Sequence, residues 1–280
     1  EKDDLVDALL VDNSARRKRQ KKLDIRVIIG NPPYSAGQES ANDNNGNVAY
    51  PHLDGRIRST YAARSQATST KNLMDSYIRA IRWASDRLGE SGIIGFVTNA
   101  GFVEASSTDG MRQCLAEEFS SISLFHLRGN QATTIGEKSR REGGKIFGSG
   151  SRTPIVISLM VKNPKAKEKG RIYFHDIGDY LTKEEKLDTV NNLRSIQGIT
   201  EADGWSLIEP DAHGDWLRQR DANVEAFWVL GDKKGDSPKL FENFSQGVLT
   251  SRDAWCINAA RRQLVSNMES MVHVYKIGRA

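Results

Sequence analysis

The sequence predicts an α/β fold with a parallel sheet in its first half, and a mixed α+β region after it. Short β-branched runs alternate with longer segments whose apolar residues recur at helical spacing, and glycine, proline or asparagine follows these runs. The chain has 280 residues, which is enough for one large or two modest domains with a substantial hydrophobic core. The alternation therefore predicts strands that helices connect into one sheet.

The first predicted elements are a helix and a short strand that ends at Gly30. Residues 5–22 suit a helix that ends in a run of basic side chains. Residues 25–29 are a β-branched run that Gly30 and two prolines end, which is typical of a buried parallel strand. The polar segment 35–68 follows, and it is too long for an idle connection in a compact domain. We therefore expect this segment to be a functional loop.

Two helix–strand pairs are expected next. Thr70 is placed to cap a helix that ends at Leu88, because the apolar residues between them form one stripe. Residues 93–98 form the second buried strand. Asp109 is placed to cap the following helix, and residues 122–127 form a third strand. This order of strand, helix, strand, helix and strand predicts a parallel α/β sheet.

The pattern changes after the third strand. Residues 130–153 are glycine-rich, basic and polar, with a single aromatic side chain, Phe147. The later predicted elements are two strands and a short helix, at 154–161, 171–175 and 182–193. From this change we expect two domains, residues 1–165 and residues 166–280.

Charge and composition permit a nucleic-acid partner. The formal net charge is +4 and the pI is about 9.0, which is mildly basic and proves no partner by itself. The sharpest basic run includes Arg16, Arg17 and Lys18. It is either a solvated helix face or a patch that contacts DNA phosphates, and the sequence leaves both interpretations open.

The spacing of cysteine, histidine and apolar residues narrows the classes of site. Cys114 and Cys256 are far apart, and the five histidines are scattered without a ligand spacing. We therefore expect no metal site, no disulfide framework and a reducing, cytoplasmic location. No run approaches the roughly 18 consecutive apolar residues that a membrane helix needs, so we expect no membrane partner. The oligomeric state does not follow from the sequence.

The strongest chemical signal is Asn31-Pro32-Pro33-Tyr34, directly after the first predicted strand. The exocyclic amine of adenine is a poor nucleophile, because its lone pair is delocalised and its nitrogen must become tetrahedral to attack a methyl group. The side-chain oxygen of Asn31 can accept one amino hydrogen and the carbonyl oxygen of Pro32 the other, which favours the transition state. The prolines stiffen this geometry, and Tyr34 offers a flat face for a base. The alternative is a proline-stiffened turn that merely ends a strand.

With a strand before it, this motif resembles that of the adenine-N6 DNA methyltransferases of restriction–modification systems. The stretch 24–38 is most similar to single-chain enzymes that fuse a nuclease, a DEAD-box-type translocase, a methylase and a target-recognition domain. The resemblance implies the C-terminal part of a Rossmann-like methyltransferase sheet that leads to a target-recognition domain. It also implies S-adenosylmethionine as the methyl donor, and double-stranded DNA from which the adenine is flipped.

The resemblance assigns further roles residue by residue. Phe147 matches the aromatic that packs on the flipped base opposite Tyr34, and its alternative role is an ordinary hairpin hydrophobe. Tyr77 matches the aromatic near the cofactor's adenine, which together with Asn31 would border the methyl donor. The alternative for Tyr77 is a core aromatic on a helix stripe. Arg252 lies where these enzymes enter the DNA-reading domain, either as a phosphate contact or as a surface arginine.

One departure from the family pattern bears on activity. These enzymes place a glycine-rich S-adenosylmethionine loop and an acidic residue for the ribose before the motif strand, whereas no glycine precedes Gly30 here. The cluster of Gly143, Gly144 and residues 148–150 does not replace that loop, since it does not lie between a strand and a helix. The sequence also lacks an initiating methionine, so we expect a piece of a longer enzyme. Two alternatives stay open, methylation of a protein glutamine amide and a non-catalytic fragment that binds DNA or a partner.

Overall fold

The computed structural model describes residues 11–34, 49–67, 69–147, 152–219, 223, 227–228, 230–231, 238–243 and 253–277. The chain divides into two units, residues 1–220 and residues 221–280. The domain boundary expected after residue 165 falls inside the first unit. Among its described residues, the second unit contains the helices α10 (Asp253–Cys256) and α11 (Arg261–Ile277).

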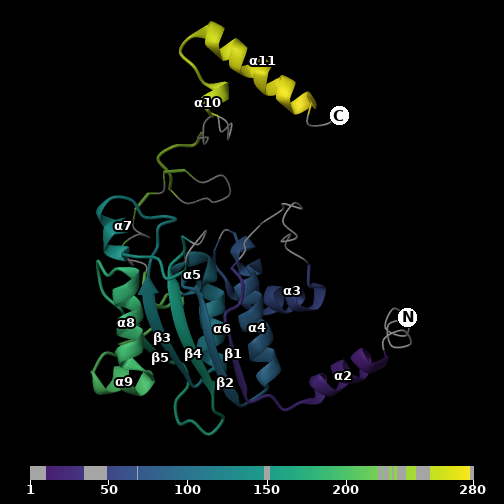
Figure 1. Ribbon diagram of the computed structural model, residues 1–280, viewed down its shortest axis with the longest axis vertical. Helices are drawn as coiled ribbons and strands as arrows, with labels where there is room; N and C mark the ends of the chain where they lie inside the picture. Colours follow the sequence, from purple (N-terminus) through teal and green to yellow (C-terminus); the bar gives the residue numbers. More distant parts are fainter. Residues whose placement is uncertain are drawn as a thin grey trace. The chain divides into compact units, whose positions relative to one another are not determined.

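A six-stranded sheet forms the centre of the first unit, with the strand order β1-β2-β4-β3-β5-β6 (Figure 1). The strands are β1 (Val27–Gly30), β2 (Gly92–Asn99), β3 (Ser121–Arg128), β4 (Ile155–Lys162), β5 (Arg171–Asp176) and β6 (Ser206–Ile208). β1 pairs with β2 and β3 pairs with β5 in parallel, whereas β4 is antiparallel to both of its neighbours and β6 is antiparallel to β5. The predicted α/β fold is confirmed, but the sheet is mixed rather than parallel.

The direction of β4 decides where its connection to β3 lies. β1, β2 and β3 run the same way, so the residues that follow them gather at one edge of the sheet, named here the motif edge. Because β4 is antiparallel to β3, the connection 129–154 begins and ends at the motif edge and does not cross the sheet. The short helices α5 (Gly101–Glu104) and α7 (Glu137–Glu142) lie at this edge (Figure 1).

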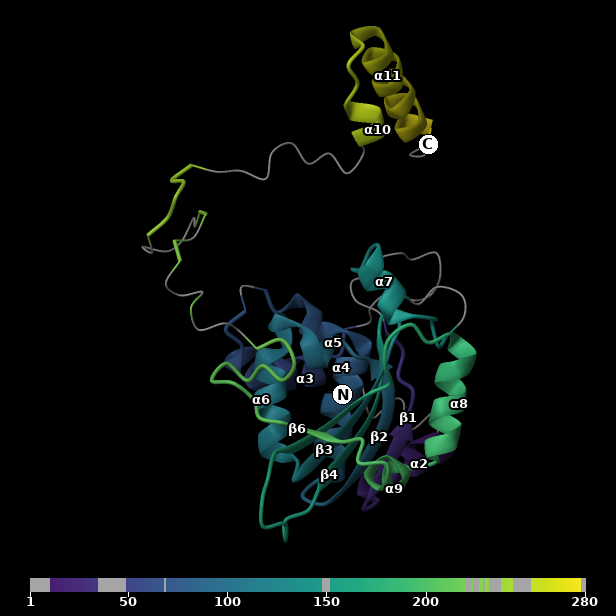
Figure 2. The same ribbon diagram turned by 90° about the vertical axis from the view of Figure 1, so that its left-hand side faces the viewer.

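Helices cover the two faces of the sheet (Figure 2). α4 (Ser76–Leu88) and α6 (Asp109–Glu118) pack on one face, and α8 (Lys183–Leu193) and α9 (Ile196–Glu201) pack on the other. The remaining described elements of this unit are α2 (Val11–Lys22), α3 (Pro51–Ile57), a π-helical turn (Arg58–Ala62) and 3₁₀ turns at Lys71–Met74 and Ser106–Thr108. Each face of the sheet therefore has its own apolar core.

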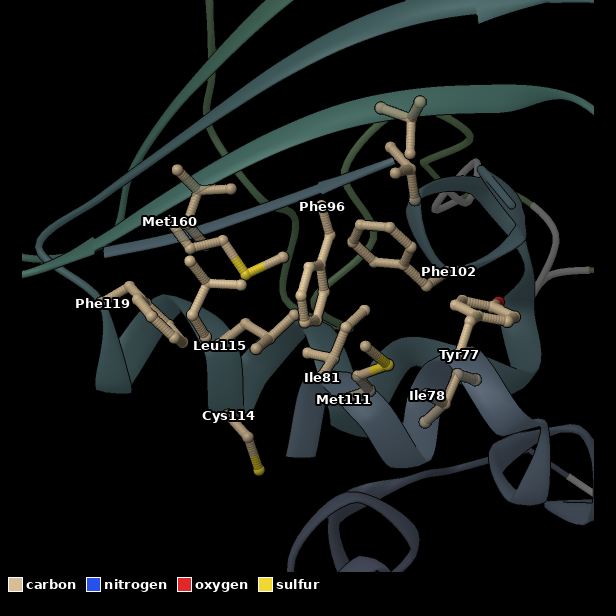
Figure 3. Close-up of a cluster of buried hydrophobic side chains, with 14 of the residues drawn as sticks. Tyr77, Ile78, Ile81, Phe96, Phe102, Met111, Cys114, Leu115, Phe119 and Met160 are labelled. Atoms are coloured by element: carbon tan, nitrogen blue, oxygen red, sulfur yellow. The ribbon is translucent and has the colours of Figure 1, made fainter. Parts of the chain in front are cut away.

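The first core lies between the sheet and the helices α4 and α6 (Figure 3). The apolar stripe of α4, which includes Tyr77, Ile81 and Leu88, is buried there against Phe96 of β2 and Leu115 of α6. Full burial of one such side chain contributes roughly 1.5–3 kcal/mol. The second core, on the other face, is smaller, and its buried members are Phe125, Leu127, Ile155, Ile177 and Ile199.

Two predicted helix caps are wrong. Thr70 precedes a 3₁₀ turn and makes no capping bond with its side chain. Asp75 caps α4 instead, because its carboxylate accepts a hydrogen bond from the N–H of Tyr77 at 3.4 Å. Asp109 is the first residue of α6, and its carboxylate accepts from the N–H of Gln66 at 2.9 Å. Asp109 thus ties the segment after α3 to α6.

The polar segment 35–68 is not one loop. Within it, α3 and the π-helical turn occupy residues 51–62, and Ile57 and Tyr61 from these turns are buried in the first core. Residues 35–48 lie outside the described residues. The segment therefore contributes in part to the first core, and it is not only a connection.

The described residues contain neither a candidate membrane span nor a candidate metal cluster. Within these residues, no helix is both long enough and apolar enough to span a lipid bilayer. The same part of the chain holds no group of three His, Cys, Asp or Glu side chains that could bind a metal ion. The expectation of no metal site stays a prediction.

Candidate active site

The four residues of the motif lie at the motif edge, directly after β1. A Cβ added at Gly30 would lie 3.4 Å from the ring of Phe96, so the backbone passes close to β2 before it leaves the sheet. Asn31 is exposed. The hydroxyl of Tyr34 donates a hydrogen bond to the side-chain oxygen of Asn31 at 2.9 Å, and it lies 3.4 Å from the carbonyl oxygen of Val97. The first and last residues of the motif thus contact each other.

The ring of Tyr34 lies where the two cores meet. It is partly buried and packs against both of them. It also makes an edge contact with Tyr77, with the ring centroids 6.3 Å apart and the planes at 84°. Burial raises the pKa of Tyr34 to about 12, so its hydroxyl stays protonated and remains a donor at neutral pH. The ring of Tyr34 is therefore partly enclosed by the two cores, and its role as a stacking face for a base stays a prediction.

Tyr77 belongs to the first core. It is 3% exposed, and its ring centroid lies 6.3 Å from that of Tyr34 and 6.4 Å from that of Phe102. Figure 3 shows Tyr77 and Phe102 beside each other in the first core. Burial raises the pKa of Tyr77, as expected for a phenol enclosed by apolar side chains. The position of Tyr77 on the apolar stripe of α4 explains this burial. The role near the cofactor's adenine that the resemblance assigns to Tyr77 stays a prediction.

Phe147 lies on the connection between β3 and β4, which belongs to the motif edge. Its neighbour Ile146 packs against the second core, as Tyr34 does. Phe147 itself is 36% exposed, and among the described residues no ring contact joins it to Tyr34. The structure therefore brings the two expected base-stacking residues to one edge without placing their rings in contact.

An open groove of about 630 Å³ borders the motif at Pro33, and Tyr50 and Trp83 contribute aromatic walls. Arg79 also lines it: the guanidinium lies 5.6 Å from the ring centroid of Tyr50 and forms a buried ion pair with Asp54 at 2.7 Å. This groove is not predicted from the sequence, because Tyr50 lies in the polar segment 35–68, which was expected to be a loop. One residue could have indicated the groove from the sequence: Trp83 is a large aromatic that falls outside the apolar stripe of α4.

A polar cluster at the motif edge was also not predicted. Glu104, at the end of α5, lies 3.3 Å from Nε2 of the buried His126 and 2.6 Å from the guanidinium of Arg218. Burial opposes ionisation of Glu104, but the nearby imidazole of His126 and the charge of Arg218 lower the pKa of this carboxyl overall. These residues are far apart in the sequence and share no spacing pattern, so only the fold reveals the cluster.

The predicted DNA contacts fall in two places. Arg16, Arg17 and Lys18 lie on α2, where Arg16 and Lys18 are exposed. Arg252 lies outside the described residues. The exposed positions on α2 agree with a phosphate contact and with a solvated helix face alike.

Comparison with known families now adds to this geometry. Residues 6–132 match the Eco57I restriction-modification methylases, and this range contains the motif, α4 and the strands β1 to β3. The chain carries an Eco57I restriction-modification methylase domain. The matched range thus contains the motif and most of the residues of the first core.

Three solved structures are similar to nearly the whole chain. A nuclease-deletion mutant of the Type ISP restriction-modification enzyme LlaGI, in complex with a DNA substrate mimic, is 44% identical over 95% of the chain, with a TM-score of 0.82. The ATP-dependent Type ISP enzyme LlaBIII bound to DNA is 40% identical over 94% of the chain (TM-score 0.84), and a DrdV–DNA complex is 34% identical over 96% (TM-score 0.82). The chain spans only 21%, 17% and 26% of these three proteins. No curated protein sequence matches it significantly.

Proposed function

We propose that the methylase domain binds the target base in a site-specific DNA adenine-N6 methyltransferase, with S-adenosylmethionine as the methyl donor. The observation that carries this proposal is the contact between Asn31 and Tyr34 at the motif edge, where an exposed carboxamide oxygen already accepts a hydrogen bond at 2.9 Å. The match to restriction-modification methylases supports the same class of reaction.

Asn31 and Pro32 are the proposed acceptors for the amino group of the target adenine. An oxygen acceptor binds an amino group more strongly as that group gains positive charge, so both oxygens stabilise the transition state more than the ground state. The prolines fix the backbone, which holds the acceptors in place without reorganisation. In this structure the hydroxyl of Tyr34 donates to the oxygen of Asn31, and because a carboxamide oxygen has two lone pairs, the same oxygen can also accept from the amino group of a base.

Double-stranded DNA is the proposed substrate, with the adenine flipped out of the duplex to reach the motif edge. LlaGI was solved with a DNA substrate mimic, and LlaBIII and DrdV were solved bound to DNA. In this chain Arg16, Arg17 and Lys18 are the proposed phosphate contacts on α2. Phe147, on the connection between β3 and β4, is proposed to pack on the flipped base.

The described residues fit S-adenosylmethionine only in part. This donor supplies an electrophilic methyl group. The groove at Pro33 has the aromatic walls Tyr50 and Trp83, which suit the flat ring of a nucleoside. No carboxylate that could bind a ribose is among the described residues that line this groove, and the neighbouring Asp54 is buried and paired with Arg79. Within the described residues, the donor side of the site is therefore less complete than the acceptor side.

A transfer assay on the full-length protein tests the proposal. Radiolabelled S-adenosylmethionine is offered with duplex DNA and with protein acceptors side by side, and the labelled DNA is digested to nucleosides. We expect the label in N6-methyladenine. Label in a protein glutamine would favour the amide-methylating alternative. Label in neither acceptor, with no binding of S-adenosylmethionine in calorimetry, would favour a DNA-binding role without catalysis.

Asn31→Ala tests the motif itself. We expect a loss of transfer of about a hundredfold or more with DNA affinity retained, because the variant lacks one transition-state acceptor. Asn192→Ala, which changes an exposed asparagine of α8, is the matched control and should keep full activity. Full residual activity of Asn31→Ala would contradict the proposed role of Asn31 as a transition-state acceptor.

A further inference from the structure

Lys186 of α8 is a buried cation in a helix whose sequence is otherwise typical of a surface. Its side chain is 0% exposed. Its ammonium donates hydrogen bonds to the carbonyl oxygens of Glu142 (2.6 Å) and Gly144 (2.8 Å), which both belong to the connection between β3 and β4. A buried ammonium is costly unless it is hydrogen-bonded, so these two contacts are what keeps it in place.

The carbonyl oxygens that Lys186 binds are joined to other parts of the connection. The carbonyl oxygen of Glu142 also accepts from the N–H of Gly129 at 3.1 Å, so Lys186 links the beginning of the connection to its middle. The N–H of Gly144 donates to the carbonyl oxygen of Leu181 at 2.8 Å, just before α8 begins. The ammonium therefore lies at the point where three separate segments of backbone meet.

Gly143 and Gly144 permit this close approach. A Cβ on Gly143 would lie 2.1 Å from the carbonyl oxygen of Leu181, and one on Gly144 would lie 2.4 Å from the backbone nitrogen of Lys183. Gly143 also has a φ of +68°, which favours glycine. These glycines, which do not fit a cofactor loop, instead let the connection lie directly against the start of α8.

We propose that Lys186 is a positioning residue of the methylase site: it holds the connection between β3 and β4 at the motif edge, so that Phe147 stays in place to pack on the flipped base. Gly144 is followed closely by Ile146, which packs against the second core that Tyr34 also contacts. A shift of the backbone at Gly144 is therefore transmitted to Phe147. The inference rests on the proposed function and names the residue that orders one of its base contacts.

The surroundings of Lys186 make this contact sensitive to pH. Burial lowers the pKa of Lys186 to about 8, and the charged groups that face it are Glu142 from α7, Arg128 from β3 and Asp176 from β5. The two carboxylates raise this pKa and the guanidinium lowers it further. Above that pH the neutral amine still has two N–H groups for the two carbonyl oxygens and carries no buried charge. Opening the contact would then require uptake of a proton, so the contact is harder to open above about pH 8 than below it.

Hydrogen exchange on the full-length protein tests the contact without reference to activity. We expect the amides of Gly129 and Gly144 to exchange about tenfold faster in Lys186→Met than in the unaltered protein, with part of the protection restored in Lys186→Arg. Lys167→Met removes an exposed ammonium from the turn between β4 and β5, at the opposite edge of the sheet, and should leave both amides unchanged. Unchanged protection in Lys186→Met overturns the proposal.

A pH series keeps the test decisive if Lys186→Met does not fold. The same two amides are then followed in the unaltered protein between about pH 7 and about pH 9, with a correction for intrinsic base catalysis. Their protection should rise as the pH rises through about 8, because opening the contact returns the pKa of Lys186 toward its ordinary 10.5 and the opened form then binds a proton that the closed form lacks. Protection that stays constant over this range overturns the proposal.

Base flipping tests whether the connection matters for the site. The target adenine is first mapped by sequencing DNA methylated by the unaltered protein, and it is then replaced by the fluorescent analogue 2-aminopurine. We expect Lys186→Met to keep DNA affinity within about twofold while turnover and the flipping signal fall about tenfold, with recovery in Lys186→Arg. Faster exchange with unchanged flipping and turnover would make Lys186 purely structural and overturn the positioning role. Failure of the proposed function is distinguished by Asn31→Ala and by the transfer assay, whatever the exchange result.

Discussion

The two faces of the sheet differ in how completely they are covered. On one face, α4 and α6 enclose the first core, in which Phe96 and Leu124 are buried. On the other, α8 and α9 cover β3 and β5, whereas Val27 and Ile29 of β1 are 55% and 82% exposed. The closed face therefore supplies most of the apolar burial that stabilises the first unit. The open face leaves an apolar strip beside the motif, and Tyr34 contacts the cores of both.

Phe102→Ala should cause the largest loss of stability, because it removes a fully buried ring from the first core, which lies on the closed face. Phe102 is fully buried, and its ring lies 6.3 Å from the ring of Trp216. We expect a loss of roughly 3–5 kcal/mol in the free energy of unfolding, measured by denaturation in guanidinium chloride. A loss below about 1 kcal/mol would mean that the closed face is not the stabilising one.

Arg112→Met tests the polar support of the same face. The guanidinium donates to the carbonyl oxygens of Gly214 and Phe102 and pairs with the buried Asp215. Its removal leaves a buried carboxylate without this partner, and we expect a loss of about 3 kcal/mol in thermal unfolding. The double variant Arg112→Met with Asp215→Leu should regain part of that loss. If the double variant is less stable than the single one, the ion pair is not the cause.

Lys186 makes the contribution of the open face depend on pH. Burial lowers its pKa from the ordinary 10.5 to about 8, so between these values the unfolded chain binds a proton that the folded protein lacks. The free energy of unfolding therefore rises from about pH 8 to about pH 10.5, and this gain is lost as the pH falls through the folded-state pKa. Relative to Lys186→Met, which cannot titrate, the gain should reach on the order of 3 kcal/mol. A stability difference that stays flat with pH contradicts the lowered pKa.

Ile29→Ala should have the smallest effect. Its side chain is exposed in this chain, so little apolar burial is lost, and we expect a change below about 0.5 kcal/mol in guanidinium denaturation. The comparison with Phe102→Ala is the sharpest one available, because both variants truncate a large apolar side chain of the same unit. Equal losses in the two variants would end the distinction between an open and a closed face.

The sequence predicts the strands and the main helices of the fold well, for a physical reason. The apolar stripe of α4 reports burial directly. The β-branched run at 25–29 predicts the strand β1 correctly but not its burial, because Val27 and Ile29 lie on a side of the sheet that no described helix covers at β1. α3 is harder to predict, because Ile57 and Tyr61 are the main side chains that its turns bury in the core, and this is too short a stripe to stand out from a polar segment. The direction of β4 cannot be predicted from its sequence, since an apolar run has the same pattern in a parallel and in an antiparallel strand.

The candidate site shows the same limit. The sequence predicts Asn31 and Tyr34 just after a strand, and the structure has them there. It does not predict that their side chains bond to each other, because that depends on how the chain turns after the prolines. Lys186 lies among charged residues such as Glu184 and Glu185, so its local sequence indicates an exposed helix. Its burial follows only from the course of the connection between β3 and β4.

Under the proposed function, the hydrogen bond from Tyr34 to Asn31 favours some bases over others. The phenol hydroxyl uses one lone pair of the Asn31 oxygen and orients that oxygen, so an entering amino group can donate to the other lone pair. A base with a carbonyl oxygen at that position, such as thymine, guanine or hypoxanthine, would meet the Asn31 oxygen acceptor to acceptor. The hydrogen bond from Tyr34 would thus favour the binding of an amino group over the binding of deaminated adenine, before any methyl group moves.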